Sequence, residues 1–331
     1  MKKVSLASAV ALCVSSGSVW ASADVDEVTH RLDIMPKVYG ALSLAFEHKD
    51  TSSEVIGSER SFKDNESYLG VRHSHEIMPG LTGFGRAEIW FDADQDQRAF
   101  DNFEYAYFGV EGDFGRVWAG TDDTVYEQKV GQIANFFQSE FRNEGEPRNI
   151  PGPFDTGRSN LLQYSTGDGE GFQFHGAVQI NGDGDKETLL REGKSSNPFQ
   201  LVSSYNSGNW QWAVGMDSND GGSGPDNENT YGARGSYLGE QLGVTAEFQY
   251  RDDVANLFGL LASYAIGPNR FALAWERGKD EVSDERTNVY SVQALHHLSE
   301  HLDLYVEAFQ SESDRFTPDT RDLLIGARYH F

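Results

Sequence analysis

The sequence predicts an all-β protein, a transmembrane antiparallel β-barrel of sixteen strands with one long connection. Three observations predict it. Apolar and polar residues alternate with period two in many short segments, and the connections between those segments alternate between tight and long. The chain also begins with the features of an export signal. An average of low hydropathy fits such a barrel, because lipid-facing and lumen-facing side chains alternate.

The first residues indicate export. Lys2 and Lys3 precede an apolar run, and an Ala-Ser-Ala run ending at Ala23 has the small residues of a cleavage site. The apolar run is too short for a spanning helix, which needs ~20 residues. We therefore expect residues 1–23 to be a cleaved signal peptide and residues 24–331 to form a single barrel domain.

The composition of the expected mature chain excludes several functions. Without Lys2, Lys3 and Cys13 it has 308 residues, with 25 basic and 52 acidic side chains and a formal net charge of −27. An exported chain without cysteine has neither disulfides nor a thiol nucleophile. Its acidity argues against nucleic acid as a partner. No nucleophile elbow, phosphate loop or zinc motif is present, so we predict no catalytic residues, metal site or cofactor.

The period-two signal is strong enough to assign strands. In the clearest segments one face is apolar and uncharged while the other is polar, as in 172–180, 210–217, 242–251, 302–309 and 322–331. The lack of charge matters because Arg or Lys at mid-bilayer on a barrel's lipid face costs roughly 2–4 kcal/mol. A soluble sandwich or barrel is the alternative, but its apolar side faces a core and does not require so many strands.

Sixteen segments have this pattern, an even number as a closed bacterial barrel requires. They are 37–47, 66–74, 81–91, 103–111, 115–121, 158–166, 171–180, 198–206, 209–217, 229–238, 241–251, 254–266, 269–277, 287–298, 301–310 and 321–331. Tight turns alternate with longer polar connections at 48–65, 92–102, 122–157, 181–197, 218–228, 278–286 and 311–320. Short periplasmic turns and long outer loops explain this asymmetry.

The connection 122–157 is the longest of these. Within it Val130, Ile133, Ala134 and Phe137 lie at helical spacing. A long loop with partial structure is usually functional, whereas the alternative is a disordered surface loop.

Several stretches resemble a known family in order and spacing. They are Leu81-Thr82-Gly83-Phe84-Gly85, Ala106-Tyr107-Phe108-Gly109-Val110-Glu111-Gly112-Asp113-Phe114-Gly115, Gly120 at the start of the long loop, Ser139-Glu140-Phe141 within it, and the terminal Tyr329-His330-Phe331. Together they are similar to the general diffusion porins, sixteen-stranded trimeric outer-membrane channels. The resemblance implies a homotrimer in the outer membrane of a Gram-negative bacterium, in contact with lipid and lipopolysaccharide. It also implies recognition of Phe331 by the barrel-assembly machinery.

The resemblance further implies that the loop 122–157 narrows the pore, with carboxylates on the loop facing a ladder of basic residues on the wall. Here the ladder is thin, because Ala41, Tyr68 and Glu104 stand where three basic residues would be, and Arg158 matches one. The expected pore-constriction residues are Tyr68, Arg72, Arg86, Glu88, Glu104, Glu140, Glu144, Glu146 and Arg158.

The expectation for Arg158 conflicts with strand parity. Arg158 shares its parity with the lipid-facing Leu162 and Tyr164, a conflict that a bulge near the strand start would remove. The acids Asp122 and Asp123, by contrast, are expected to be solvated surface charges, as is Glu127.

Carboxylates across a narrow aqueous gap attract cations. We therefore predict passive diffusion of small hydrophilic solutes and ions with cation preference. A substrate-selective channel, for example for oligosaccharides, stays open as an alternative, because aromatic residues have inward parity at Tyr68, Phe84, Trp90 and Phe108. An outer-membrane hydrolase lacks a visible Ser, His and acid set. An adhesin acting through the outer loops is compatible with a pore.

Overall fold

The computed structural model describes residues 35–52, 57–94, 103–131, 133, 136–138, 157–167, 169–180, 197–219, 228–315 and 318–331. The predicted signal peptide lies outside the described residues. Within them, no helix combines the length and the apolar character needed to cross a bilayer.

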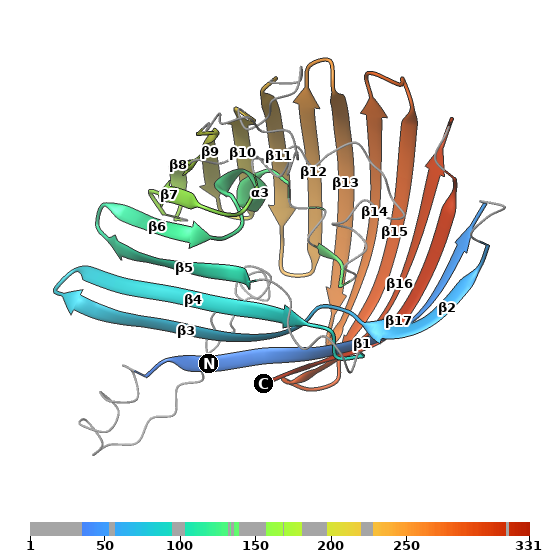
Figure 1. The fold of residues 1–331 in the computed structure, drawn as a ribbon, viewed down its shortest axis with the longest axis horizontal. Helices are drawn as coiled ribbons and strands as arrows, with labels where there is room; N and C mark the ends of the chain where they lie inside the picture. The colour runs from blue at the N-terminus through green and yellow to red at the C-terminus, as the bar shows by residue number, and fades with distance from the viewer. Residues whose placement is uncertain are drawn as a thin grey trace, which may run out of the picture.

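The described residues form a β-barrel with one short helix, α3 (Val125–Lys129), in the connection after β6 (Figure 1). The strands are β1 (Lys37–Thr51), β2 (Glu59–Asp64), β3 (Ser67–Met78), β4 (Leu81–Phe91), β5 (Phe103–Gly112), β6 (Gly115–Thr121), β7 (Leu161–Ser165), β8 (Gly171–Gln179), β9 (Phe199–Ser207), β10 (Trp210–Asp217), β11 (Thr230–Leu238), β12 (Leu242–Arg251), β13 (Ala255–Ile266), β14 (Asn269–Asp280), β15 (Arg286–His297), β16 (Leu302–Ser313) and β17 (Thr320–His330).

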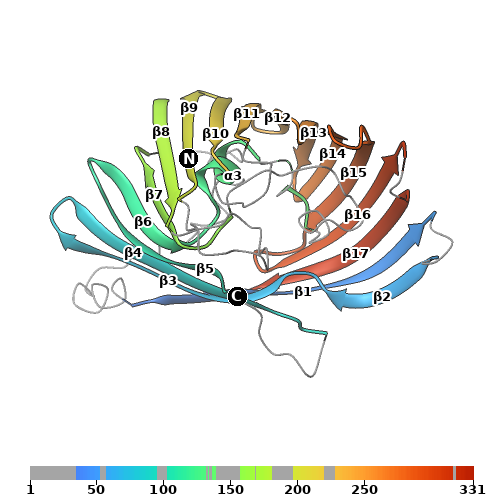
Figure 2. The same ribbon diagram turned by 45° about the horizontal axis from the view of Figure 1, so that its top comes forward.

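Each strand pairs antiparallel with its neighbours in the chain, and β1 closes the cylinder by pairing with β17. Both β2 and β3 pair with β1, so these two strands together occupy one position of the barrel. The structure therefore confirms the predicted barrel of sixteen strand positions, one of which is split in two. Figure 2 shows the closed wall and the chain segments inside it.

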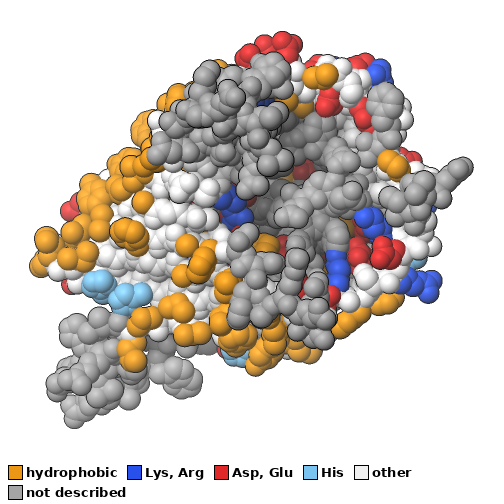
Figure 3. Space-filling model, in the orientation of Figure 1, with side chains coloured by type: hydrophobic (Ala, Val, Ile, Leu, Met, Phe, Trp, Pro, Cys, Tyr) orange, Lys and Arg blue, Asp and Glu red, His pale blue; other side chains and the backbone are white. Residues whose placement is uncertain are grey.

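The alternation of side chains is also as predicted. On β15 the outward side chains of Tyr290 and Val292 are exposed, whereas Ser291 and Gln293 between them are almost fully buried. Hydrophobic side chains gather along the left and lower margin of the molecule in Figure 3. An apolar exterior and a polar interior match lipid outside and water inside.

One predicted connection was wrong. The range 48–65 was expected to be a loop, but β1 continues to Thr51 and β2 occupies Glu59–Asp64. Apart from Phe62 the side chains of β2 are polar or charged, so this strand has little apolar alternation to detect. The strands β14 and β16 likewise extend beyond their predicted ends, which shortens the connections that follow them.

The split between β2 and β3 is a β-bulge. Ala41 pairs with Tyr68 and Leu44 pairs with Asp64, so two residues of β1 oppose three residues of the neighbouring position. Glu66, inside the bulge, has a positive φ of 66°. The extra residue changes the side-chain parity, so that Asn65 and Tyr68, three positions apart, both face the interior. Ser67 between them is also fully buried.

The segment after β6 turns into the barrel. Thr124 caps helix α3 by accepting a hydrogen bond from the N–H of Glu127. Tyr126 and Val130 then pack with the inward side chains of Val202 and Ala213. Ile133 and Phe137, further along, belong to a second apolar cluster with β13–β17. The described part of this connection therefore lies along the inner wall and not over the outer surface.

Candidate functional site: the inner wall of the barrel

A polar cluster around Glu88 marks the inner wall at β1, β3 and β4. The Oη of Tyr39 donates a 2.8 Å hydrogen bond to one carboxylate oxygen of Glu88, and Arg86 Nη2 donates to the same oxygen at 2.7 Å. The other oxygen accepts from Trp90 Nε1 at 3.3 Å. The side chain of Glu88 is only 3% exposed, and the ion pair with Arg86 offsets the cost of its burial.

A second cluster adjoins it because β5 has a bulge. Glu88 pairs with Tyr105 but the next residue, Ile89, pairs with Phe103, so Glu104 is an extra residue. The bulge brings both Glu104 and Tyr105 to the inner side. Glu104 forms an ion pair with Arg158, and the guanidinium of Arg86 lies 3.7 Å from the ring centroid of Tyr105.

Arg158 joins these strands to the connection that follows β6. Its guanidinium forms ion pairs with both Glu104 and Asp123, and Tyr105 donates a 3.1 Å hydrogen bond to Asp123. This ring of two acids, one base and a phenol lies where the chain leaves the wall and turns inward. Charge-assisted bonds of this kind hold side chains in fixed positions.

The parity conflict at Arg158 is resolved ahead of strand β7, not by a bulge within it. Residues 158–160 form a bend, and Asn160 has a left-handed φ of 56°. The regular strand begins only at Leu161, whose side chain faces inward while that of Leu162 faces outward. Because Arg158 precedes the regular strand, the alternation of β7 does not determine its direction, and its side chain reaches the interior.

Tyr68 and Arg72 also face inward, as predicted. The rings of Tyr39 and Tyr68 meet edge to face at 6.1 Å, and the guanidinium of Arg72 lies 5.3 Å from the ring centroid of Tyr39. Next to them, Arg116 lies over Phe84 at 3.9 Å. The wall from β1 to β6 therefore alternates aromatic rings with guanidinium groups; its aromatic residues are Tyr39, Tyr68, Phe84, Trp90, Tyr105, Tyr107 and Trp118.

The inward assignment of Phe108 was wrong. Phe108 is 74% exposed and faces outward. Its neighbours Tyr107 and Gly109 pair with the inward-facing Arg86 and Phe84. Counting parity from Glu104 fails here because the bulge at that residue shifts every later position of β5 to the opposite face.

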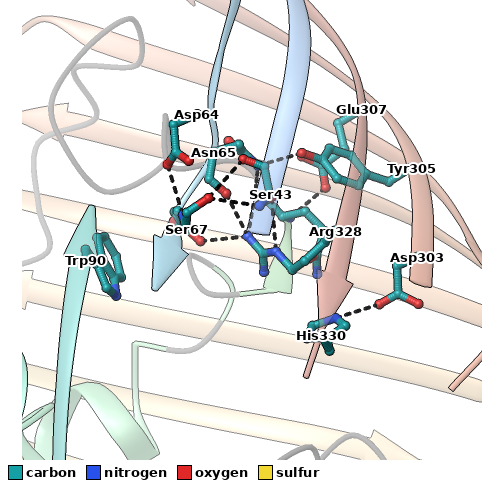
Figure 4. A network of polar contacts seen from close by, with 12 residues as sticks. Ser43, Asp64, Asn65, Ser67, Trp90, Asp303, Tyr305, Glu307, Arg328 and His330 are labelled. Carbon is teal, nitrogen blue, oxygen red and sulfur yellow. Dashed lines mark hydrogen bonds and ion pairs between the residues drawn. The ribbon is translucent and has the colours of Figure 1, made fainter. Parts of the chain in front are cut away.

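In its described part the inner segment ends at Gln138, against the wall where β16 and β17 adjoin β1 and the split between β2 and β3; Figure 4 shows these wall residues. Asn65 Nδ2 donates to the carbonyl of Gln138 and also to Tyr305 Oη, the latter at 2.7 Å. The N–H of Gln138 donates to Glu307 at 2.7 Å. Arg328 Nη2 donates to the carbonyl of Asn65 at 3.1 Å. Both the backbone donor and the backbone acceptor of Gln138 are therefore bonded to wall residues.

A glycine on β17 makes room for the side chain of Tyr305, which takes part in this attachment. The ring of Tyr305 lies over Gly326 on the neighbouring strand β17. A Cβ added at Gly326 would be 2.2 Å from Tyr305 Cζ. Only glycine fits there without displacing Tyr305, whose Oη accepts the hydrogen bond from Asn65.

The interior carries more acid than base. Among the described residues, eight buried side chains are acidic and two are basic; they are Glu47, Glu88, Asp122, Asp217, Glu247, Glu276, Glu307 and Asp322 against Arg234 and Arg251. The described part of the chain contains no group of three or more His, Cys, Asp or Glu side chains arranged to hold a metal ion.

The expectation of solvated acids was wrong for Asp122 and Asp123. Asp122 is 7% exposed and accepts a 2.7 Å hydrogen bond from Trp118 Nε1. The pKa of Asp122 is raised to about 7, first by burial and second by the neighbouring charge of Asp123. Asp123 itself is bound by Arg158. The sequence could have suggested this only through the inward course of the loop.

The structure thus brings together six of the predicted constriction residues: Arg86, Glu88, Glu104 and Arg158 in the two clusters, with Tyr68 and Arg72 beside them on β3. Glu140, Glu144 and Glu146 lie outside the described residues. Tyr39 and Tyr105, both at the centre of the contacts, were not predicted from the sequence. The inward parity of Tyr39 on its strand was an available signal. The inward position of Tyr105 could not be inferred, because it depends on the bulge at Glu104.

A closed antiparallel barrel with an apolar exterior and a charged, polar interior defines a bacterial outer-membrane channel. The sequence profile of the Gram-negative porins matches residues 7–315, and the chain belongs to that family. Its family and fold point to a channel protein and not to an enzyme.

Relatives and solved structures agree with this assignment. The chain is 26% identical over 287 residues to a monosaccharide porin of Halomonas sp. and equally to the major outer membrane protein of Halomonas elongata, covering 81% of this chain and 77% of theirs. The anion-selective porin of Comamonas acidovorans has a TM-score of 0.71 at 16% identity, covering 90% of this chain and 99% of that one. Salmonella typhi OmpF, solved with daunomycin, has a TM-score of 0.70 at 15% identity, covering 89% and 97%. At these identities the two structures show the fold alone.

Proposed function

We propose that this outer-membrane channel supports passive diffusion of small hydrophilic solutes and ions and prefers cations. The observation that carries the proposal is the charge of the interior, where buried acids outnumber buried bases among the described residues. Acidic side chains around a narrow aqueous path attract cations and repel anions. The fold sets no preference, since a porin of similar fold is described as anion-selective.

We further propose that the connection 122–157 narrows the pore. Its described residues lie against the inner wall and are bonded to it at Gln138. The carboxylates predicted on its remainder, Glu140, Glu144 and Glu146, would face the wall cluster of Arg86, Glu88, Glu104 and Arg158.

The test is reconstitution into a planar bilayer. In a tenfold KCl gradient we expect stepwise conductance and a reversal potential on the cation side. A reversal potential on the anion side would overturn the preference, and absence of any conductance would overturn the channel. Steps in groups of three would support a homotrimer, which we propose from the resemblance to the diffusion porins.

A second candidate, a channel selective for sugars, is favoured by the aromatic wall from β1 to β6. Sugar rings stack on aromatic faces, and one relative is named a monosaccharide porin. Saturable block of the KCl current by glucose or maltose would support this candidate. Flux that rises linearly with sugar concentration would support general diffusion.

Export and assembly follow from the sequence. We propose that residues 1–23 are removed as a signal peptide and that residues 24–331 form one barrel. We also propose that Phe331 is recognised by the barrel-assembly machinery and that the apolar exterior contacts lipid and lipopolysaccharide. The intact mass of protein purified from outer membranes tests the cleavage site, and truncation of Phe331 tests assembly.

A further inference from the structure

A recess lies in the inner wall on the side opposite the aromatic wall. It has a volume of about 130 Å³ and is formed by inward side chains of β10–β14 together with Phe136 of the inner segment. It includes the β11–β12 turn at Gly239 and Glu240. The recess therefore lies at the end of the barrel with the short turns, which is the periplasmic end in bacterial barrels.

The most unusual residue of the recess is Arg234 on β11. It is 7% exposed, and its Nε has no hydrogen-bond partner among the described residues. Glu247 faces it across the β11–β12 pair. A buried donor without an acceptor is unfavourable, because it has lost its hydrogen bonds to water. An acceptor arriving from the lumen would restore this missing bond.

A second guanidinium lines the same recess. Arg270 on β14 donates from Nε to Gln293 Oε1 at 3.1 Å, and its guanidinium lies 4.7 Å from the ring centroid of Phe136. Glu240 is the acidic side chain of the lining, so two guanidinium groups share the recess with one carboxylate. With Glu247 beside Arg234, the acids and bases at this place are balanced, but the guanidinium groups are the charged side chains that outnumber carboxylates in the lining itself.

The remaining polar lining suits hydroxyl groups. Ser236 Oγ and Thr245 Oγ1 are hydrogen-bonded to each other at 2.9 Å. Each hydroxyl oxygen can accept a further hydrogen bond. Ser263 and the amides of Gln211 and Gln241 complete the lining. Hydroxyls and amides can both donate to and accept from a polyol.

We propose that this recess is a binding subsite for a small hydroxylated carboxylate of the sugar-acid class. The carboxylate would bind Arg234, with Arg270 adding charge, and the hydroxyls would bind Ser236, Thr245 and Ser263. A planar guanidinium matches carboxylate geometry. The inference rests on the proposed function, since the solute must enter the lumen to reach the recess.

The test uses the full-length mature protein in a planar bilayer in KCl, with sodium D-glucuronate added in millimolar steps on the short-turn side. We expect saturable current block by glucuronate, and at least tenfold weaker block by D-glucose and by acetate. Arg234→Gln should weaken the glucuronate block at least tenfold. Arg277→Gln is the matched control, because Arg277 on β14 is exposed on the outer face, and it should behave as the wild type.

Equal block of wild type and Arg234→Gln by glucuronate would overturn the subsite. So would equal block of the wild type by glucuronate and acetate, because the hydroxyl contacts would then contribute nothing. If Arg234→Gln does not assemble, Arg270→Gln takes its place with the same expectation. Normal KCl conductance without glucuronate block overturns the subsite alone, whereas a wild type without KCl conductance overturns the channel itself.

Discussion

The backbone N–H of Gln138 donates a 2.7 Å hydrogen bond to the carboxylate of Glu307, 169 positions later in the chain. Glu307 is fully buried on β16 and also accepts a 2.6 Å bond from Gln293 Nε2 on β15. The inner segment is thereby attached to two strands of the wall far from where it left β6. This attachment holds Gln138 against the wall.

Removing the Glu307 carboxylate should loosen the inner segment. In Glu307→Ala the donors of Gln138 and Gln293 lose a buried acceptor, at a cost of about 1–3 kcal/mol each. We expect a larger and noisier single-channel conductance and a lower temperature for loss of the folded, SDS-resistant band. Glu307→Gln, which keeps an acceptor oxygen, should lie between the variant and the wild type. Unchanged conductance and thermal resistance in Glu307→Ala would show that this bond does not position the segment.

Neutralising Arg158 should increase cation preference. Arg158 is the base that pairs with both Glu104 and Asp123, so Arg158→Gln leaves two acids beside the path of the ions. One unit charge about 6 Å from an ion in screened water changes its relative concentration roughly two- to threefold. The permeability ratio of K⁺ to Cl⁻, calculated from the reversal potential in a KCl gradient, should therefore increase by that factor. Arg277→Gln on the outer face is the control, and an equal shift there would contradict the assignment.

The selectivity should depend on pH near neutrality because of Asp122. Its pKa is raised to about 7, first by burial and then by Asp123, so the side chain is neutral at pH 5.5 and ionised at pH 8.5. Cation preference should therefore rise between these values, and Asp122→Asn should reduce the rise. Reversal potentials at the two pH values provide the measurement. A rise of the same size in the variant would assign the effect to other groups.

The same pKa shift has the opposite sign for stability. A carboxyl with a folded pKa above its ordinary value near 4 stabilises the fold fully at low pH. This contribution is lost as pH rises from about 4 to about 7. The stability difference between the wild type and Asp122→Asn should therefore change in favour of the variant across that window. Urea unfolding at pH 4.5 and 8 measures it, and a constant difference would contradict the raised pKa.

The bulge at Glu104 predicts opposite accessibility for two positions of the same nominal parity. The expected mature chain lacks cysteine, so single cysteines can be introduced without background. A charged methanethiosulfonate should modify Glu104→Cys and change the conductance, because this position faces the lumen. Phe108→Cys should resist that reagent and react with a lipid-soluble maleimide, because it faces outward. Identical labelling of the two variants would contradict the bulge.

Most of the barrel was predictable because its signal is repeated and local. Alternation along β12 or β15 requires only that one face touch lipid and the other water, a condition that each strand satisfies independently of its partners. The tight turns between these strands are equally local. The strand β2 was missed because Phe62 is its only strongly apolar side chain.

The sequence pattern alone establishes the class of the molecule, since sixteen segments with an uncharged apolar face on every second residue are more than a soluble sandwich or barrel requires and suit a closed sheet with lipid outside. The tertiary structure decided which side chains line the lumen where that alternation is broken. The bulges at Glu66 and Glu104 and the left-handed Asn160 each change parity by one residue. Beside them Glu104 and Arg158 reach the interior and pair with each other, and Arg158 also pairs with Asp123 at the start of the inner segment. Such a break costs little locally and is repaid by contacts with residues distant in the chain, which a pattern of neighbouring residues does not record.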